Sequence, residues 1–329
     1  MQIINGKEIA QKIIERLKGQ SASWRTEKIL AVIQVGENPA SLSFIKQKEK
    51  VSKELNVDFR LYKFTEELSQ DDLRKEVVKI SNLKKVGGII VQLPLPDNIN
   101  PARDRSAEGA ATTATGRSVS NGVNAQYVLN AIPREKDIDV LGERALGAFY
   151  AGRNPVLPPA AATVEELLQV TGYELKVAKV AVVGLGQLVG KPISVWLMKK
   201  CKELYLLDQE SDLGILKQAD LVICGVGKAG IIKPDMLKES ASIIDFGYER
   251  SSPSVRSNAL GSEGQPSFAK ASEGQERSGK ISGDFDSSQL TNLPTNQLTN
   301  FYTPTPGGTG PVLVAKIFEN FYTLNNESR

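Results

Sequence analysis

The chain has 329 residues, a length that suggests about two domains, each long enough to bury its own core. Hydrophobic residues make up 40% and charged residues 24%, which excludes disorder throughout the chain. The formal net charge is only +3, from 41 basic and 38 acidic residues without one basic block, so nucleic acid is not the expected partner.

The sequence contains no histidine. This excludes Ser-His and Cys-His nucleophile pairs and His-based zinc sites, so no metal is expected and the chemistry must depend on other side chains or a cofactor. The two cysteines, Cys201 and Cys224, stand in separate apolar stretches and indicate packing residues in a cytoplasmic protein. No apolar run is long enough to span a membrane, and residues 1–14 are amphipathic rather than typical of a signal peptide.

Helical and strand patterns alternate along the chain. In the first half, helices are predicted at 7–18, 38–56 and 70–83 and strands at 29–35, 59–64 and 87–93. In the second half, helices are predicted near 164–170, 189–200 and 312–324 and strands at 177–184, 203–208, 219–227 and 241–247. This alternation predicts an α/β protein with parallel strands, doubly wound in its second half.

Two stretches interrupt the alternation, at about 102–122 and 250–281. Both are rich in small and polar residues, and the second contains the near repeat GSEGQ and ASEGQ. We expect solvated surface loops there. An alternative is that they bind a partner or cover the active site.

Glycines at 184, 186 and 190 stand between an apolar strand and a predicted helix. There the backbone can approach a pyrophosphate at the helix N-terminus, so this segment is a candidate dinucleotide site; the alternative is a tight turn that binds nothing. Asp208 ends the next strand, where an acid would bond the ribose 2′-hydroxyl and favour NAD over NADP. An exposed turn aspartate explains it equally well.

Three further segments carry candidate site residues. Phe44 and Lys48 lie four apart on one helix, so a lysine in an apolar cleft could transfer protons, although most helix lysines are simply solvated. Gln92 lies in VQLPLP, near the carboxyl end of a strand, and points into a cleft or sits on a strand face. The loop TPTPGGTGP at 303–311 is either a cradle for a phosphate or ring, or a domain connection.

Together these segments resemble the bifunctional methylenetetrahydrofolate dehydrogenase/methenyltetrahydrofolate cyclohydrolase family of one-carbon metabolism. The resemblance covers nearly the whole chain. The segments that carry it are NPASLSFIKQKEK at 38–50, VQLPLPDNIN at 91–100, EKDID at 135–139, GLGQLVGKP at 184–192, ADLVICGVGKAG at 219–230, IIDFG at 243–247, SGDFD at 282–286 and TPTPGGTGP.

The resemblance implies two α/β domains around a cleft. A folate-binding catalytic domain would comprise residues 1–153 and the returning C-terminal helix at about 311–329. A Rossmann-like NAD(P)-binding domain would comprise 154–310. The resemblance also implies tetrahydrofolate substrates and a homodimer formed through the cofactor domain.

The resemblance implies roles for particular residues. Lys48 corresponds to the catalytic lysine of the cyclohydrolase step, Gln92 to the glutamine that tunes it, and Asp139 to the carboxylate that holds the pterin ring. The implied folate-pocket residues are Phe44, Pro306, Gly307 and Gly308. The implied cofactor-binding residues are Gly184, Leu185, Gly186, Gln187, Gly190 and Asp208.

The activity implied is oxidation of 5,10-methylenetetrahydrofolate with NAD(P), followed by hydrolysis of the 5,10-methenyl product to 10-formyltetrahydrofolate. NADP is the cofactor expected from the family. Two residues depart from the family pattern. Phe44 stands where the family generally has tyrosine, which bears on the cyclohydrolase step. Leu185 stands where the family often has Arg or Ser, which bears on the choice of NADP. The alternatives are a monofunctional, NAD-preferring dehydrogenase and a non-catalytic folate- or nucleotide-binding scaffold.

Overall fold

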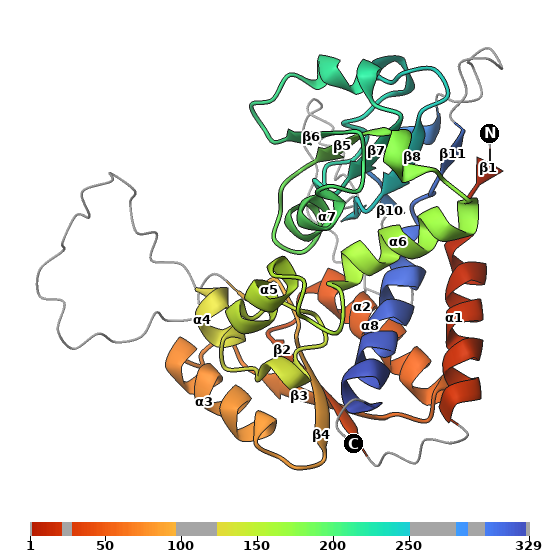
Figure 1. Ribbon diagram of the computed structural model, residues 1–329. Helices are drawn as coiled ribbons and strands as arrows, with labels where there is room; N and C mark the ends of the chain where they lie inside the picture. The colour runs from red at the N-terminus through yellow and green to blue at the C-terminus, as the bar shows by residue number, and fades with distance from the viewer. Residues whose placement is uncertain (1, 22–27, 97–123, 251–280, 289–299, 327–329) are drawn as a thin grey trace, which may run out of the picture.

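The computed structural model describes residues 2–21, 28–96, 124–250, 281–288 and 300–326. Two parallel sheets, of six and three strands, organise them with helices packed on both, and a short antiparallel two-stranded sheet accompanies them (Figure 1). The α/β prediction with parallel strands is confirmed. The predicted loop at 102–122 and nearly all of that at 250–281 lie outside the described residues.

The three-stranded sheet has β2 (Ile29–Val35) in the middle, with β3 (Asp58–Phe64) and β4 (Val86–Val91) parallel on either side. Every residue of β2 is buried, which explains its continuous apolar run. The crossover helices are α2 (Pro39–Glu54) and α3 (Gln70–Ser81).

Alternate residues of β2 contribute to two cores. Ile29, Ala31 and Ile33 belong to the core that includes α3 and the short helix α4 (Ala125–Leu129). Leu30 and Val32 belong to the core that includes α1 (Gly6–Ser21) and α8 (Thr309–Asn326). The period of two along a strand therefore places one helical layer on each face of the sheet.

The six-stranded sheet has the order β1-β11-β8-β7-β5-β6 and all its pairs are parallel. Its strands are β1 (Gln2–Ile3), β5 (Lys179–Val183), β6 (Glu203–Leu207), β7 (Leu221–Cys224), β8 (Ser242–Asp245) and β11 (Phe301–Tyr302). The helices of this part are α6 (Pro159–Thr171) and α7 (Gly190–Leu197). This is the Rossmann-type arrangement expected for the second half.

Helix α8 lies against α1, α2 and α6 and thereby joins the two halves of the molecule (Figure 1). Its close approach to β4 depends on Gly88, because a Cβ there would lie 2.7 Å from the Phe321 ring. At the other end of the chain, β1 pairs with β11 although α1 packs in the core beneath the three-stranded sheet. Both terminal segments therefore contact both halves.

The structure differs from the predicted elements mainly at their ends. Helix α6 begins at Pro159 rather than near 164, and β7 and β8 end three and two residues earlier than predicted, at Cys224 and Asp245. The sequence analysis missed α4, β1 and α5 (Glu143–Tyr150), because such short elements carry little periodicity. Among the described helices, none combines the length and the apolar character of a membrane span.

Candidate active site

Helix α2 carries the candidate lysine. It begins where the sequence indicates, since Asn38 Oδ1 accepts a hydrogen bond from the Ser41 backbone N–H at 3.2 Å and Pro39 is the first helical residue. Lys48, three turns further on, is only 5% exposed, unlike Lys46 and Lys50 of the same helix, which are exposed. Most lysines on helices are solvated, so a buried lysine is a candidate functional group.

Gln92 meets Lys48 from the three-stranded sheet. Its backbone N–H donates to Ile33 O at 2.8 Å, so it continues the pairing of β4 with β2. Its side chain accepts a hydrogen bond from Lys48 Nζ at 3.0 Å through Oε1, while Nε2 donates to Leu93 O at 3.1 Å. The amide is thus held at both ends, which places its oxygen against the buried Lys48 Nζ.

Asp139 is the charged group that acts on Lys48. Burial lowers the pKa of Lys48, and the negative charge of Asp139 partly opposes that shift. Burial in turn raises the pKa of Asp139, and the positive charge of Lys48 opposes it. The two charges therefore stabilise each other in a site that penalises both. Lys48, Gln92 and Asp139 come from three segments far apart in the sequence.

Asp137 holds the segment that carries Asp139, a role that sequence analysis missed. Its carboxylate accepts the backbone N–H groups of Gly142 at 2.7 Å and Leu141 at 3.1 Å. Burial raises the pKa of Asp137 to about 7, against the lowering effect of these hydrogen bonds. Asn320 of α8 fixes the same segment by donating to Ile138 O at 2.8 Å.

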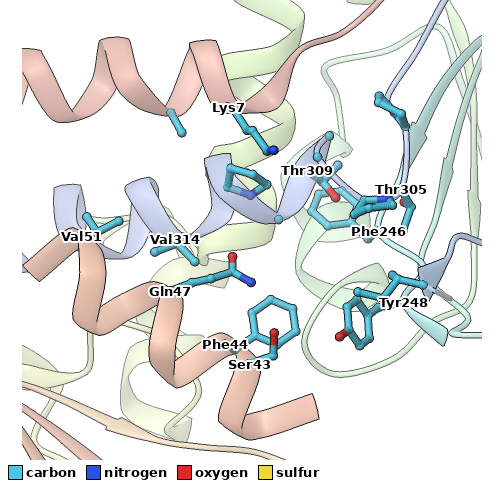
Figure 2. A pocket seen from close by; sticks show the side chains of 18 of the residues that line it. Lys7, Ser43, Phe44, Gln47, Val51, Phe246, Tyr248, Thr305, Thr309 and Val314 are labelled. Carbon is cyan, nitrogen blue, oxygen red and sulfur yellow. The ribbon is translucent and has the colours of Figure 1, made fainter. Parts of the chain in front are cut away.

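A cavity of about 410 Å³ lies between α1, α2, the segment after β8 and the start of α8 (Figure 2), and Lys48, Gln92 and Asp139 are not among its lining residues. Its size is within the usual range for small-molecule sites. Phe44 lines it from α2, and the 304–311 loop lines it from the start of α8 with Pro306, Gly307 and Gly308. Lys48 lies one helical turn beyond Phe44, on the face of α2 that turns toward Gln92.

The 304–311 loop is tightly packed. Gly308 N–H donates to Pro304 O at 2.7 Å, and Gly307 has a φ of +105°. A Cβ on Gly6, at the start of α1, would lie 1.7 Å from Gly308 O. Thr309 Oγ1 donates to Asp245 O at 2.8 Å, which fixes the first turn of α8 to the end of β8.

The glycine loop between β5 and α7 has the features of a dinucleotide cradle. Gly184 has a φ of +86°, and a Cβ on Gly190 would lie 1.8 Å from Gly184 O. Only glycine at both positions lets the strand turn this sharply into the helix. Gly186 lies at the exposed tip of the loop, where backbone N–H groups can meet a phosphate.

The other candidate cofactor residues differ in what they offer. The Leu185 side chain packs against the core, so only its backbone is available to a ligand. Gln187 donates to Gln126 of α4 at 2.8 Å and links the loop to the first half of the chain. Asp208 is exposed at the end of β6, with its carboxylate accepting the Gln209 backbone N–H at 3.0 Å. An exposed carboxylate with this turn contact is compatible with both earlier interpretations, a ribose-binding acid and a turn aspartate.

Cys224, Asp245 and Asp284 converge below the loops of the six-stranded sheet. Backbone N–H groups occupy the carboxylates: Phe285 and Gly247 donate to Asp245, and Val226 and Lys228 donate to Asp284. Burial raises the pKa of Asp245 to about 6. These contacts hold loops together. Cys224 packs in the core, as expected, and its thiol also donates to Asp245 Oδ1 at 3.4 Å, whereas Cys201 is half-buried beside the core.

Comparison with protein families gives two matches that cover most of the chain. Residues 4–106 match the family described as "Tetrahydrofolate dehydrogenase/cyclohydrolase, catalytic domain". Residues 158–329 match "Tetrahydrofolate dehydrogenase/cyclohydrolase, NAD(P)-binding domain". A similar curated relative is the "Bifunctional protein FolD" of Bacillus licheniformis, 29% identical over 327 residues that cover 97% of this chain and 95% of the relative.

Solved structures agree with this match. A FolD methylenetetrahydrofolate dehydrogenase/cyclohydrolase from Campylobacter jejuni superposes with a TM-score of 0.77 at 27% identity, covering 99% of each chain. The fold is also that of the Trypanosoma brucei enzyme complexed with NADP and an inhibitor, at a TM-score of 0.78 and 21% identity, over 99% of this chain and 97% of that one.

Proposed function

The chain belongs to the tetrahydrofolate dehydrogenase/cyclohydrolase family, and from this premise we propose how its residues divide the two reactions. The protein is a bifunctional enzyme: it oxidises 5,10-methylenetetrahydrofolate with NAD(P) and hydrolyses the 5,10-methenyl product to 10-formyltetrahydrofolate. The proposal concerns the side chains, and the observation that carries it is the 3.0 Å hydrogen bond between buried Lys48 and Gln92 beside Asp139.

Lys48 acts as the proton carrier of the hydrolysis. Water adds to the carbon of the methenyl cation, and one proton leaves the adduct. The bond from that carbon to N5 then breaks as N5 gains a proton and the hydroxyl loses one, which leaves a formyl group on N10. An uncharged Lys48 amine near this carbon accepts the hydroxyl proton, and the ammonium returns it to N5.

Gln92 and Asp139 set the state of that lysine. Burial favours the amine, whereas the Asp139 charge favours the ammonium, so both forms are accessible to a group that must accept and release a proton. The Gln92 amide fixes Nζ in position without adding a charge. Asp139 also offers carboxylate oxygens to the pterin ring.

The cavity lined by Phe44, one helical turn before Lys48, suits the rest of a folate molecule. Phe44 and the loop residues Pro306, Gly307 and Gly308 provide apolar and backbone surface for the aminobenzoyl group. Lys7 and Lys50 line the same cavity and can face the anionic glutamate tail. The cavity therefore fits an elongated aromatic acid.

The loop of Gly184, Gly186 and Gly190 fits a dinucleotide, because Gly184 and Gly190 let the strand turn sharply into α7 and no atom lies within 4 Å of a Cβ placed on the exposed Gly186. Gln187 and the Leu185 backbone complete the wall of this site. These residues would hold a nicotinamide dinucleotide, which would supply the hydride acceptor for the methylene carbon. We assign NADP as the cofactor, with NAD the alternative that Leu185 and Asp208 favour; the ratio of kcat/KM for the two cofactors decides between them.

We also propose a cytoplasmic homodimer that serves one-carbon metabolism and, through 10-formyltetrahydrofolate, purine biosynthesis. Two free cysteines support a reducing compartment. β6 is the edge of the six-stranded sheet within the described residues, and Leu206 on it is 43% exposed, which supports pairing of subunits there. Light scattering of the wild type and of Leu206→Lys tests the dimer: a wild-type monomer contradicts it.

Lys48→Met tests the assignment of the lysine. The variant is expected to lose cyclohydrolase activity by a factor of about 100 or more and to keep substantial dehydrogenase activity, since hydride transfer needs positioning rather than a base. Nicotinamide reduction and methenyl absorbance are followed together. Lys46→Met, on the exposed face of α2, is the matched control. Undiminished hydrolysis in Lys48→Met refutes the assignment.

A further inference from the structure

Tyr248 carries a hydroxyl that the known interactions do not use. The oxygen is buried and has no hydrogen-bond partner among the described residues. Burying a hydroxyl without a partner is unfavourable, so such groups usually have a role when a ligand binds. Tyr248 lies three residues past Asp245, the last residue of β8, and belongs to none of the groups assigned above.

The backbone around Tyr248 is firmly held. Gly247 N–H donates to Asp245 Oδ1 at 2.7 Å, and a Cβ on Gly247 would collide with Asp284. On the other side, Glu249 accepts the Ala229 backbone N–H at 2.5 Å and begins β9 (Glu249–Arg250), which pairs with β10 (Ile281–Ser282). The ring is therefore presented from a fixed turn, as a binding residue requires.

The Tyr248 ring lines the same cavity as Phe44. Its centroid lies 5.5 Å from that of Phe44, at an interplanar angle of 55°, so rings from the two halves of the molecule form one wall. Figure 2 shows the Tyr248 hydroxyl directed toward Phe44 and Ser43 of α2. Phe44 has no polar atom to offer, and the Tyr248 hydroxyl is the polar group beside it.

We propose that Tyr248 is a substrate-binding residue whose hydroxyl hydrogen-bonds the amide that joins the benzoyl group of the folate to its glutamate. This rests on the proposed function of the cavity. The benzoyl ring lies along the Phe44–Tyr248 wall, and a small shift of the two rings on binding uncovers the hydroxyl. The second half of the chain thereby contributes directly to folate recognition and not only to cofactor binding.

Tyr248→Phe tests the proposal because it removes one oxygen and keeps the ring. The dissociation constant for tetrahydrofolate and the KM for the methylene substrate are expected to rise about 5- to 10-fold, as for the loss of one hydrogen bond. The dissociation constant for NADP is expected to stay within a factor of two. The thermal midpoint of the free protein stays the same or rises, since the hydroxyl has no described partner to lose.

Tyr150→Phe is the matched control, because Tyr150 is 74% exposed on α5 and lines no described site. If the wild type and Tyr248→Phe bind tetrahydrofolate equally well, the role of Tyr248 is overturned while the proposed function stands. If Tyr248→Phe binds NADP more weakly but folate as before, that role is also overturned. If its thermal midpoint falls and folate binding is unchanged, the hydroxyl stabilises the fold and does not bind the substrate. A wild type that binds no tetrahydrofolate overturns the proposed function itself.

Discussion

Replacing Gln92 with glutamate places a negative charge 3.0 Å from Lys48 Nζ with almost no change in shape. Coulomb's law at an effective dielectric constant of about 20 gives roughly 5 kcal/mol for charges at that separation. Desolvation of the new carboxylate offsets about half of this, which leaves about 2–3 kcal/mol in favour of the ammonium. The negative charge of Asp139 also favours the ammonium form of Lys48, so the two carboxylates act in the same direction.

The sign of the effect follows from the role of the amine. A nearby carboxylate raises the pKa of Lys48, so the uncharged amine becomes scarcer at neutral pH by about 30- to 150-fold. Cyclohydrolase activity of Gln92→Glu should fall by that factor at pH 7 and recover as the pH rises. The dehydrogenase should respond much less, because its hydride transfer needs no base.

The assay is the pH dependence of methenyl hydrolysis, corrected for the spontaneous reaction, in the wild type, Gln92→Glu and Gln92→Met. The methionine variant removes the hydrogen-bond acceptor without adding charge, so it serves as the uncharged control. The activity of Gln92→Glu is expected to rise at a higher pH than that of the wild type. A rise at the same or a lower pH would refute the reasoning. An equal shift in Gln92→Met would refute it too.

Three further predictions concern the cofactor loop and stability. Gly190→Ala brings a Cβ to within 1.8 Å of Gly184 O, so NADP binding measured by titration should be lost while the cyclohydrolase is reduced much less; normal NADP affinity would contradict this. Burial raises the folded pKa of Asp137 to about 7, above its unfolded value, so the folded state loses stability as the pH rises from about 4 to 7. Asp137→Asn should therefore destabilise less at pH 8 than at pH 5, and thermal unfolding showing the reverse order would refute it. Lys316→Met removes a buried ammonium that contacts Glu166 at 3.1 Å and also Glu319, and leaves Arg16 as the remaining cation of this group, so it should cost about 2 kcal/mol in urea unfolding; an unchanged midpoint would show that these ion pairs contribute little.

Much of the fold could be predicted because its elements are long and strongly patterned. The seven buried residues of β2 and the Asn38–Pro39 start of α2 are local signals, and both elements were placed within a residue or two. The two-residue strands β1 and β11 could not be predicted, since their pairing depends on segments about 300 residues apart in the sequence.

The site was less accessible from local pattern. Lys46, Lys48 and Lys50 look alike in the sequence, and only the contact with Gln92, 44 residues away, distinguishes Lys48 by burial. The resemblance to the family named that lysine; spacing alone did not. The proposed role of Tyr248 could not be predicted from the sequence near it, because it depends on contact with the Phe44 ring in the other half of the molecule.

Helix α8 has a consequence for how this protein can be divided. Residues 158–329 match one family description, yet a fragment with those bounds would expose Phe318 and Phe321, which are fully buried in the core shared with α1 and β2. The remaining fragment would lack the helix that closes its own sheet. Neither half is a separable module, so recombination or truncation between them is expected to give aggregation-prone pieces. Dividing the chain between its halves is therefore not expected to separate the dehydrogenase from the cyclohydrolase, whereas single substitutions at their sites are.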